Sequence, residues 1–288
     1  MPYLYLVLST ISSAALTIFA TVFNKINSNK KDTAILYNFL LMISVFILWG
    51  ILFAFNFSFD AGVLIYSLIF SVSFICCNLG LVQALKHGPT TLTTLIVNLS
   101  LVLVTIWGFI FWQAKVTTLV IIGLVLVVIS LILCLYNKKS PQKSISLKWI
   151  FYVVLAFFGN ASCTISQRTQ QLQYAGQHGE MLMFFATGLS VIVYAILFFK
   201  NDRSCTKIIL KQSWWAPIGA GVANIGLNLF VMLLATTSLS PSLIYPFISI
   251  GGLAIVTLLS VLVFKEKMKC WQWIGIGIGA IATLLLSI

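Results

Sequence analysis

The stretch from Val116 to Tyr136 reads VTTLVIIGLVLVVISLILCLY and contains no charged residue. A helix needs about 20 mostly apolar residues to cross a bilayer, because each residue adds about 1.5 Å and the hydrocarbon layer is about 30 Å thick. A strand of a membrane β-barrel would instead be about ten residues long, with alternating apolar and polar side chains. This stretch does not alternate, so it predicts a transmembrane helix.

The composition of the whole chain also indicates a membrane environment. Of its 288 residues, 60% are hydrophobic and only 8% are charged, and the mean hydropathy is +1.08. A soluble domain is usually about a quarter charged, so the composition excludes a water-soluble globule, a disordered chain and a disulfide scaffold. The six cysteines show no metal-ligand spacing, and we predict neither a metal site nor a cofactor.

Ten apolar runs divide the chain, each bounded by charged residues, Pro, Gly or Asn. We therefore predict an all-α membrane protein with ten transmembrane helices and no separate soluble domain. The longest polar connections are 137–146 and 200–213, which we expect to be loops. The runs cover residues 3–23, 34–55, 62–85, 91–112, 117–136, 149–168, 180–199, 213–235, 241–264 and 271–288.

The basic residues predict the orientation of these spans. If the ten spans alternate in direction, 15 of the 17 Lys and Arg residues fall on one side, and only Lys115 and Arg168 fall on the other. The positive-inside rule places the richer side in the cytoplasm, so both termini are predicted to lie outside the plasma (cytoplasmic, or cell inner) membrane. Because the basic residues occupy short loops between apolar runs, we expect lipid and not nucleic acid beside them.

Polar residues recur in the same order in the two halves of the chain. Thr17, Thr21 and Asn24 of the first run align with Asn160, Thr164 and Gln167 of the sixth, and Asn78 aligns with Asn228. With five helices in each half, the second half enters the membrane from the opposite face. The sequence therefore predicts two inverted five-helix repeats, residues 1–140 and 141–288, with a binding site at their interface near the midplane.

Two local patterns complete a resemblance to a known family. The third run ends in the tight turn QALKHGP at 83–89, and the block VLVFKEKM at 261–268 is followed by the Gly-rich WQWIGIG at 271–277. With its length and its five-plus-five layout, the chain resembles ten-span, EamA-like members of the drug/metabolite transporter (DMT) superfamily. The resemblance implies metabolite transport, with runs 117–136 and 271–288 as an outer scaffold.

Several predicted helices each bring one polar face into the membrane. Polar side chains are costly in hydrocarbon unless they face other helices or a water-filled cavity. One alternative is that each Ser or Thr bonds to its own helix and that Asn side chains join helices. The other is a central cavity for substrate, lined by Thr17, Asn78, Asn98, Asn160, Thr164, Gln167, Asn224, Asn228, Tyr245 and Ser249.

The placement of the charged residues limits the classes of solute that we expect the protein to transport. All five acidic residues lie in loops or at run ends, so a cation in the cavity would have no counter-charge, and proton-coupled export of hydrophobic cations is disfavoured. An uncharged or zwitterionic polar solute fits better. Gate candidates are Lys86 and His87 at the cytoplasmic rim, with Arg168 and Glu180 at the outer rim, where Arg168 either pairs with Glu180 or meets lipid headgroups.

We therefore predict a secondary active transporter of small polar metabolites, such as amino-acid-like solutes, that works by alternating access and is not an enzyme. The alternatives are a multidrug efflux carrier of the same superfamily and a flippase for lipid-linked substrates. A membrane enzyme would need paired carboxylates, a His cluster or a metal site, which His87, His178 and the scattered acids do not form. The sequence is consistent with a monomer and with a dimer through runs 117–136 and 271–288.

Overall fold

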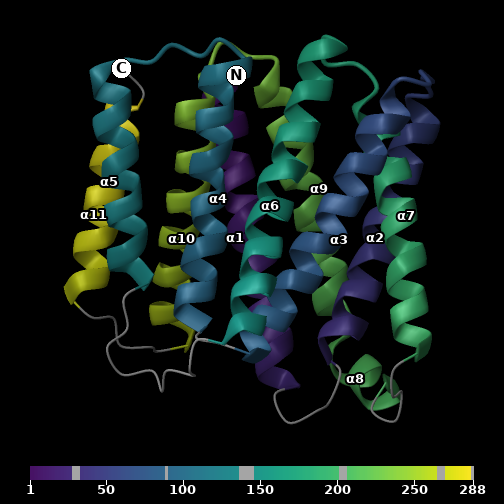
Figure 1. Cartoon of the computed structure of the whole chain (residues 1–288). Helices are drawn as coiled ribbons and strands as arrows, with labels where there is room; N and C mark the ends of the chain where they lie inside the picture. Colours follow the sequence, from purple (N-terminus) through teal and green to yellow (C-terminus); the bar gives the residue numbers. More distant parts are fainter. Residues whose placement is uncertain (28–32, 88–89, 136–145, 201–205, 265–269, 287–288) are drawn as a thin grey trace. The chain divides into compact units, whose positions relative to one another are not determined.

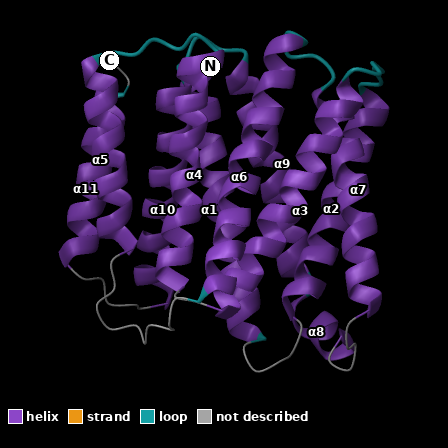
Figure 2. Ribbon diagram, viewed as in Figure 1, coloured by secondary structure: helices purple, strands orange, loops and turns teal. Residues whose placement is uncertain are grey.

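The computed structural model describes residues 1–27, 33–87, 90–135, 146–200, 206–264 and 270–286. Within these ranges all regular secondary structure is α-helical, as Figure 2 shows. The helices labelled in Figure 1 are α1 (Pro2–Ile26), α2 (Thr33–Phe55), α3 (Val63–His87), α4 (Thr90–Phe111), α5 (Thr118–Leu135), α6 (Leu147–Gln173), α7 (Gly179–Lys200), α8 (Thr206–Ser213), α9 (Trp215–Ala235), α10 (Pro241–Phe264) and α11 (Cys270–Leu285).

Each predicted apolar run forms a helix, and two differences from the prediction have clear physical causes. Helix α6 continues to Gln173, past the expected end at residue 168, because its last turns are buried and hydrogen-bonded; Gln170 Nε2, for example, donates to the Gln177 carbonyl at 2.9 Å. Helix α8 lies in the connection 200–213, which was expected to be a loop. That expectation was wrong, because burial of Ile209 stabilises a short helix there.

Six helices of the described chain are long and apolar enough to cross a membrane: α1, α2, α3, α6, α7 and α9. Four further apolar stretches, in α4, α5, α10 and α11, are shorter within the described residues. Large apolar side chains such as Ile65, Ile121 and Ile192 are exposed along these helices, as expected where lipid is the solvent. The fold is therefore that of an all-helical membrane protein.

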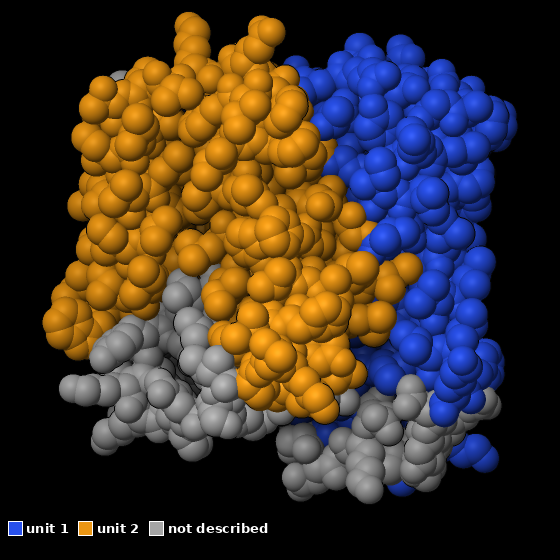
Figure 3. Space-filling model, viewed as in Figure 1, with its two compact units in different colours: residues 1, 3–72, 166–236 blue, residues 2, 73–165, 237–288 orange. Residues whose placement is uncertain are grey.

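The helices form two compact units, coloured separately in Figure 3. Unit 1 contains residues 1, 3–72 and 166–236, and unit 2 contains residues 2, 73–165 and 237–288. Each unit takes helices from both sequence halves, and α3 and α6 contribute to both units. The division 1–140 and 141–288 thus describes the predicted repeat and does not coincide with the compact units.

In unit 1, helix α2 packs against α7 and α9. Aromatic rings make much of the α2–α7 contact: Phe39 stacks on Phe198 with 5.1 Å between ring centroids, and Phe46 stacks on Phe184 at 4.9 Å. As the residue number rises along α2 it falls along α7, so the two helices are antiparallel.

In unit 2, helices α5 and α11 pack closely along much of their length. The Ser130 hydroxyl of α5 donates a hydrogen bond of 2.7 Å to the Gly275 carbonyl of α11, while Gly123 lies against Leu286. These two contacts again pair rising with falling residue numbers, so α5 and α11 are antiparallel.

Helices α3 and α6 touch backbone to backbone where they cross in unit 2. A Cβ atom at Gly80 would lie 2.8 Å from the Ala156 nitrogen, and one at Gly159 would lie 2.6 Å from the Cys77 nitrogen. Small residues allow this close approach, which replaces the hydrophobic effect as a source of helix association in lipid. The crossing brings Cys77 and Asn160 close together.

This crossing generates a stability prediction. Gly159→Ala places a methyl group against the α3 backbone, so we expect a loss of about 1–3 kcal/mol and a lower thermal unfolding midpoint in detergent. The matched control is Gly277→Ala, because no described atom lies within 4 Å of a Cβ at that position; alanine should be neutral or slightly stabilising there. Equal midpoints for the two variants would contradict the crossing.

Candidate functional site

Three side-chain amides in unit 1 form a chain of hydrogen bonds, which we call the amide ladder: Gln167 of α6 and Asn228 and Asn224 of α9. Gln167 Nε2 donates to the Asn228 carbonyl at 3.2 Å and to Asn228 Oδ1 at 3.3 Å. Asn228 Nδ2 donates to the Asn224 carbonyl at 2.9 Å and to Asn224 Oδ1 at 3.0 Å. Asn224 and Asn228 are one turn apart on α9 and so share a face, and Gln167 reaches this face from α6.

The two ends of the amide ladder keep unused hydrogen-bonding capacity. Gln167 is 4% exposed and Asn224 is 8% exposed. No other described residue donates to Gln167 Oε1 or accepts from Asn224 Nδ2, and neither atom is sealed away from solvent. A side-chain amide offers two donor hydrogens and an acceptor oxygen, so the ladder leaves an acceptor at one end and a donor at the other.

A second polar group, the Asn160 cluster, lies in unit 2 and consists of Asn160, Ser100 and Cys77. Asn160 Nδ2 donates to Ser100 Oγ at 2.7 Å, and Cys77 Sγ lies 4.0 Å from Asn160 Oδ1. Thr164, one turn further along α6, donates from Oγ1 to the Asn160 carbonyl at 3.3 Å. The cluster therefore joins α3, α4 and α6 within unit 2.

Sequence reasoning identified Asn160 but missed its two partners. It placed Asn98 of α4 toward the site, whereas the structure bonds Ser100 to Asn160. Residues two apart on a helix point to nearly opposite sides, and the Asn98 side chain makes no hydrogen bond to another described residue. A serine in an apolar run gives no signal of its own, because it usually bonds to its own helix, as Ser100 also does through the Val97 carbonyl at 2.6 Å.

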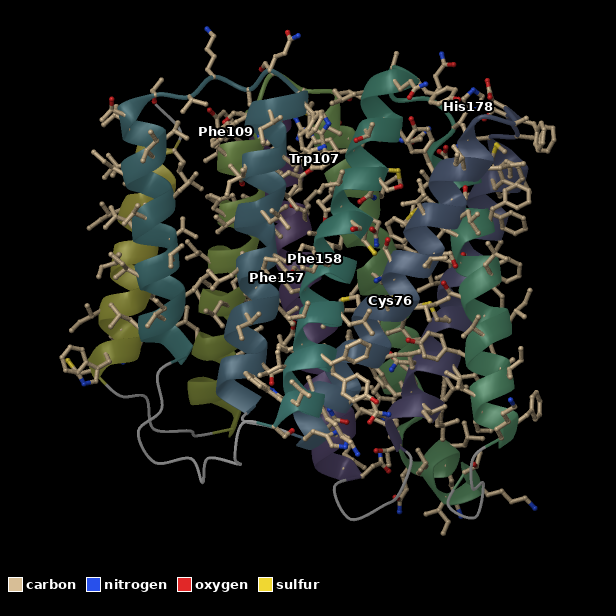
Figure 4. All side chains as sticks on the ribbon, viewed as in Figure 1. Cys76, Trp107, Phe109, Phe157, Phe158 and His178 are labelled. Carbon is tan, nitrogen blue, oxygen red and sulfur yellow. The ribbon has the colours of Figure 1, made fainter. Side chains whose placement is uncertain are left out.

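Aromatic rings accompany the Asn160 cluster on the same helices. Trp107 lies two turns after Ser100 on α4, and Phe157 lies one turn before Asn160 on α6 (Figure 4). By helical spacing each ring shares a face with the polar residue of its helix. Trp107 also stacks on Phe111, with ring centroids 4.1 Å apart.

Like Thr164, two further predicted lining residues, Thr17 and Asn78, bond to carbonyls of their own helices. Thr17 Oγ1 donates to the Ser13 carbonyl at 3.1 Å, and Asn78 Nδ2 donates to the Phe74 carbonyl at 2.9 Å. These bonds follow the alternative in which polar side chains satisfy themselves locally.

The predicted residues of α10 are enclosed in unit 2. Tyr245 is buried, and Ser249 lies one turn further along the helix. The Ser249 hydroxyl is sealed from solvent and has no hydrogen-bond partner among the described residues.

Of the ten predicted lining residues, the structure brings three together in the amide ladder, and two more, Asn160 and Thr164, lie together in unit 2.

The gate candidates Arg168 and Glu180 belong to unit 1, and His87 belongs to unit 2. Arg168 is buried, and Glu180 Oε1 accepts a hydrogen bond of 3.4 Å from Asn56 Nδ2. His87 is exposed at the end of α3, where its Nδ1 lies 2.8 Å from the Gln83 carbonyl. The Lys86 side chain lies outside the described residues.

A further polar cluster joins the α2–α3 connection to the α6–α7 connection in unit 1. His178 Nδ1 lies 2.9 Å from Ser58 Oγ, and the Tyr174 hydroxyl donates to Asp60 Oδ1 at 3.5 Å; Figure 4 labels His178. Sequence reasoning did not find this cluster, because its members come from two loops far apart in the chain. No group of three or more His, Cys, Asp or Glu side chains in the described part of the protein is placed to hold a metal ion.

Comparisons with known proteins identify a fold but no activity. No protein-family model matches the sequence, and no curated protein matches it. Among solved structures 28 chains match. One of them, described as "Crystal structure of protein", is 10% identical with a TM-score of 0.74, and the alignment covers 99% of this chain and 95% of that one. At this identity the likeness concerns the fold alone.

The amide ladder predicts energetic coupling between its members. In a double-mutant cycle of Gln167→Ala and Asn228→Ala, thermal unfolding should give a coupling free energy of about 0.6 kcal/mol, the typical value for a hydrogen bond between membrane helices. The control cycle pairs Thr17→Ala with Asn228→Ala, which should be additive because Thr17 bonds to its own helix. Strict additivity in the Gln167–Asn228 cycle would contradict the ladder.

Proposed function

We propose that this protein is a secondary active transporter that moves small, uncharged or zwitterionic polar organic solutes across a membrane by alternating access. The proposal is carried by the amide ladder. Its amides lie on two membrane-length helices, where Gln167 and Asn224 are buried and Asn228 is half-buried. Gln167 Oε1 and Asn224 Nδ2 make no hydrogen bond to other described residues.

The chemistry of the ladder suits a solute with both donor and acceptor groups. Burying a polar group costs free energy unless it is hydrogen-bonded, so packing alone would favour apolar residues at these positions. An amide oxygen binds an ammonium, hydroxyl or amide donor, while an amide N–H binds a carboxylate or carbonyl oxygen. An amino-acid-like solute therefore matches the two free ends of the ladder without requiring a charged residue.

The proposal includes ten membrane spans, and helix directions support this number. Within unit 2, Trp149 Nε1 donates to Thr93 Oγ1 at 2.8 Å, and Asn160 donates to Ser100. Residue numbers rise together along α4 and α6 in these two pairs, so the helices are parallel. In the sequence between α4 and α6, the chain must therefore cross the membrane once in the opposite direction, and we assign this crossing to α5.

Helix lengths agree with this number of spans. Helix α4 has 22 residues and α10 has 24, which correspond to about 33 and 36 Å at 1.5 Å per residue. Helices α5 and α11 have 18 and 16 residues, or about 27 and 24 Å, close to the thickness of the hydrocarbon layer.

We also propose the inverted repeat, with α1 to α5 equivalent to α6, α7, α9, α10 and α11. Two helices pack antiparallel on their own equivalents, α2 on α7 and α5 on α11, as an inverted repeat requires. In addition, Gly219 and Gly226 of α9 lie against Phe19 and Ser12 of α1. In the proposed repeat α1 is equivalent to α6, and α9 is equivalent to α3. The α1–α9 contact is therefore equivalent to the α6–α3 contact, which also involves glycines.

The cytoplasmic membrane location, the outside position of both termini and membership of the DMT superfamily are parts of the same proposal. They rest on the distribution of basic residues and on the motifs at 83–89 and 261–277. Efflux of hydrophobic cations has less support, because the described carboxylates lie near helix ends: Asp60 is in the α2–α3 connection and Glu180 is in the first turn of α7.

A solute screen followed by a flux assay tests the function. Among neutral amino acids, polyols and organic cations, we expect a polar uncharged or zwitterionic solute to raise the unfolding midpoint of the purified protein, since binding stabilises by mass action. In proteoliposomes, Asn228→Ala and Asn160→Ala should each lower uptake of that solute about tenfold or more.

The matched control is Ser130→Ala, which removes the hydrogen bond between α5 and α11 and should leave the affinity for the solute unchanged. Stabilisation by organic cations alone, or full uptake by both asparagine variants, would contradict the proposed function.

A further inference from the structure

Helix α8 (Thr206–Ser213) lies at a membrane surface by its position in the chain. It connects α7 to α9, two helices of membrane-spanning length. With eight residues it extends only about 12 Å, too short to cross the hydrocarbon layer. The helix therefore begins and ends at the same membrane face, the face that also holds the end of α1 (Figure 1).

One side of α8 is held firmly in unit 1. Ile209 is 2% exposed and belongs to a hydrophobic cluster with Phe23, Leu36 and Ala216. Because α1, α2 and α9 each contribute one of these partners, α8 has a defined position on the end of the unit.

A hydrogen-bonded asparagine joins α8 to the end of α1. Asn27 Nδ2 donates to the Phe23 carbonyl at 2.9 Å and to Ser213 Oγ at 2.9 Å, and the Ser213 hydroxyl donates to the Ile209 carbonyl at 3.0 Å. Asn27 and Ser213 are both buried. This buried hydrogen bond therefore couples the position of α8 to the end of α1.

The opposite side of α8 combines positive charge with exposed apolar surface. Lys207 and Lys211 are exposed and one turn apart, a spacing at which like charges repel in the absence of an anion. Ile208 and Trp214 beside them are 52% and 54% exposed, and Trp215 is 41% exposed. Lysine, tryptophan and aliphatic side chains together are typical of a helix that lies in the headgroup region of a membrane.

No described carboxylate is available to neutralise these lysines. The described acidic residues are Asp60 and Glu180, and Glu180 lies at the start of α7, whereas the chain reaches α8 after the end of α7 at Lys200. The two ends of α7 are about 30 Å apart, so Glu180 is well beyond the screening distance in salt. Among the described residues, which do not include Asp202 of the α7–α8 connection, this surface therefore has no anionic partner.

We propose that α8, with Trp214 and Trp215, is a binding site for the headgroup of an anionic phospholipid. Lys207 and Lys211 contact the lipid phosphate, while Ile208 and Trp214 enter the boundary between headgroups and acyl chains. Through Asn27, the bound lipid stabilises the junction between α1 and α8. The inference depends on the membrane fold and not on the identity of the transported solute.

Lipid binding to the purified full-length protein in detergent tests this proposal. Phosphatidylglycerol should remain bound in native mass spectrometry and should raise the unfolding midpoint. Without lipid, the double variant Lys207→Gln, Lys211→Gln should have an unfolding midpoint equal to or slightly above that of the wild type, because the repulsion between the lysines is removed. It should bind phosphatidylglycerol about 30-fold more weakly, as expected for two lysines near an anionic surface.

The matched control removes the same charge elsewhere, at the exposed Lys115 and Lys148, and should retain wild-type affinity. Equal loss in both double variants would overturn the proposal, because the effect would then follow net charge. It would also be overturned if phosphatidylcholine stabilised the protein as well as phosphatidylglycerol, or if glycerol phosphate without acyl chains replaced the lipid. Because the readout is lipid binding, a failed solute screen would not affect the result.

Discussion

Polar groups placed in hydrocarbon must find hydrogen-bond partners, and this constraint governs the interior of a protein that is 60% hydrophobic. Helical backbones satisfy it by themselves, so the remaining demand comes from side chains. Thr17 and Asn78 meet it within their own helices. Gln167, Asn228 and Asn224 meet it across two helices and still leave an acceptor and a donor unused. This unused hydrogen-bonding capacity is the basis of the proposal that the amide ladder binds a solute.

The polar clusters depend on close helix packing. In unit 2, glycines at the α3–α6 crossing let the backbones touch, and this contact brings Cys77 of α3 to Asn160 of α6. Lipid supplies no hydrophobic force between helices, so such small-residue contacts and interhelical hydrogen bonds hold the unit together. The glycines of unit 2 therefore set the distance between α3 and α6. At this distance the side chains of Cys77 and Asn160 can interact.

Much of the fold could be predicted from the sequence, because apolar runs of membrane length leave little choice of secondary structure. Helix α8 could not, because its stability depends on Ile209 packing against Phe23 and Leu36, residues almost two hundred positions earlier. For the site, the local spacing of Asn224 and Asn228 was readable. The bonds from Asn160 to Ser100 and from Asn56 to Glu180 depend on how helices meet, which periodicity in one helix does not encode.

The most direct test of the central claim is an experimental structure of the protein with a stabilising polar solute bound. The account predicts solute density in contact with both free ends of the amide ladder, accepting a hydrogen bond from Asn224 Nδ2 and donating one to Gln167 Oε1. Solute bound elsewhere, with these two atoms bonded to neighbouring protein groups, would contradict it.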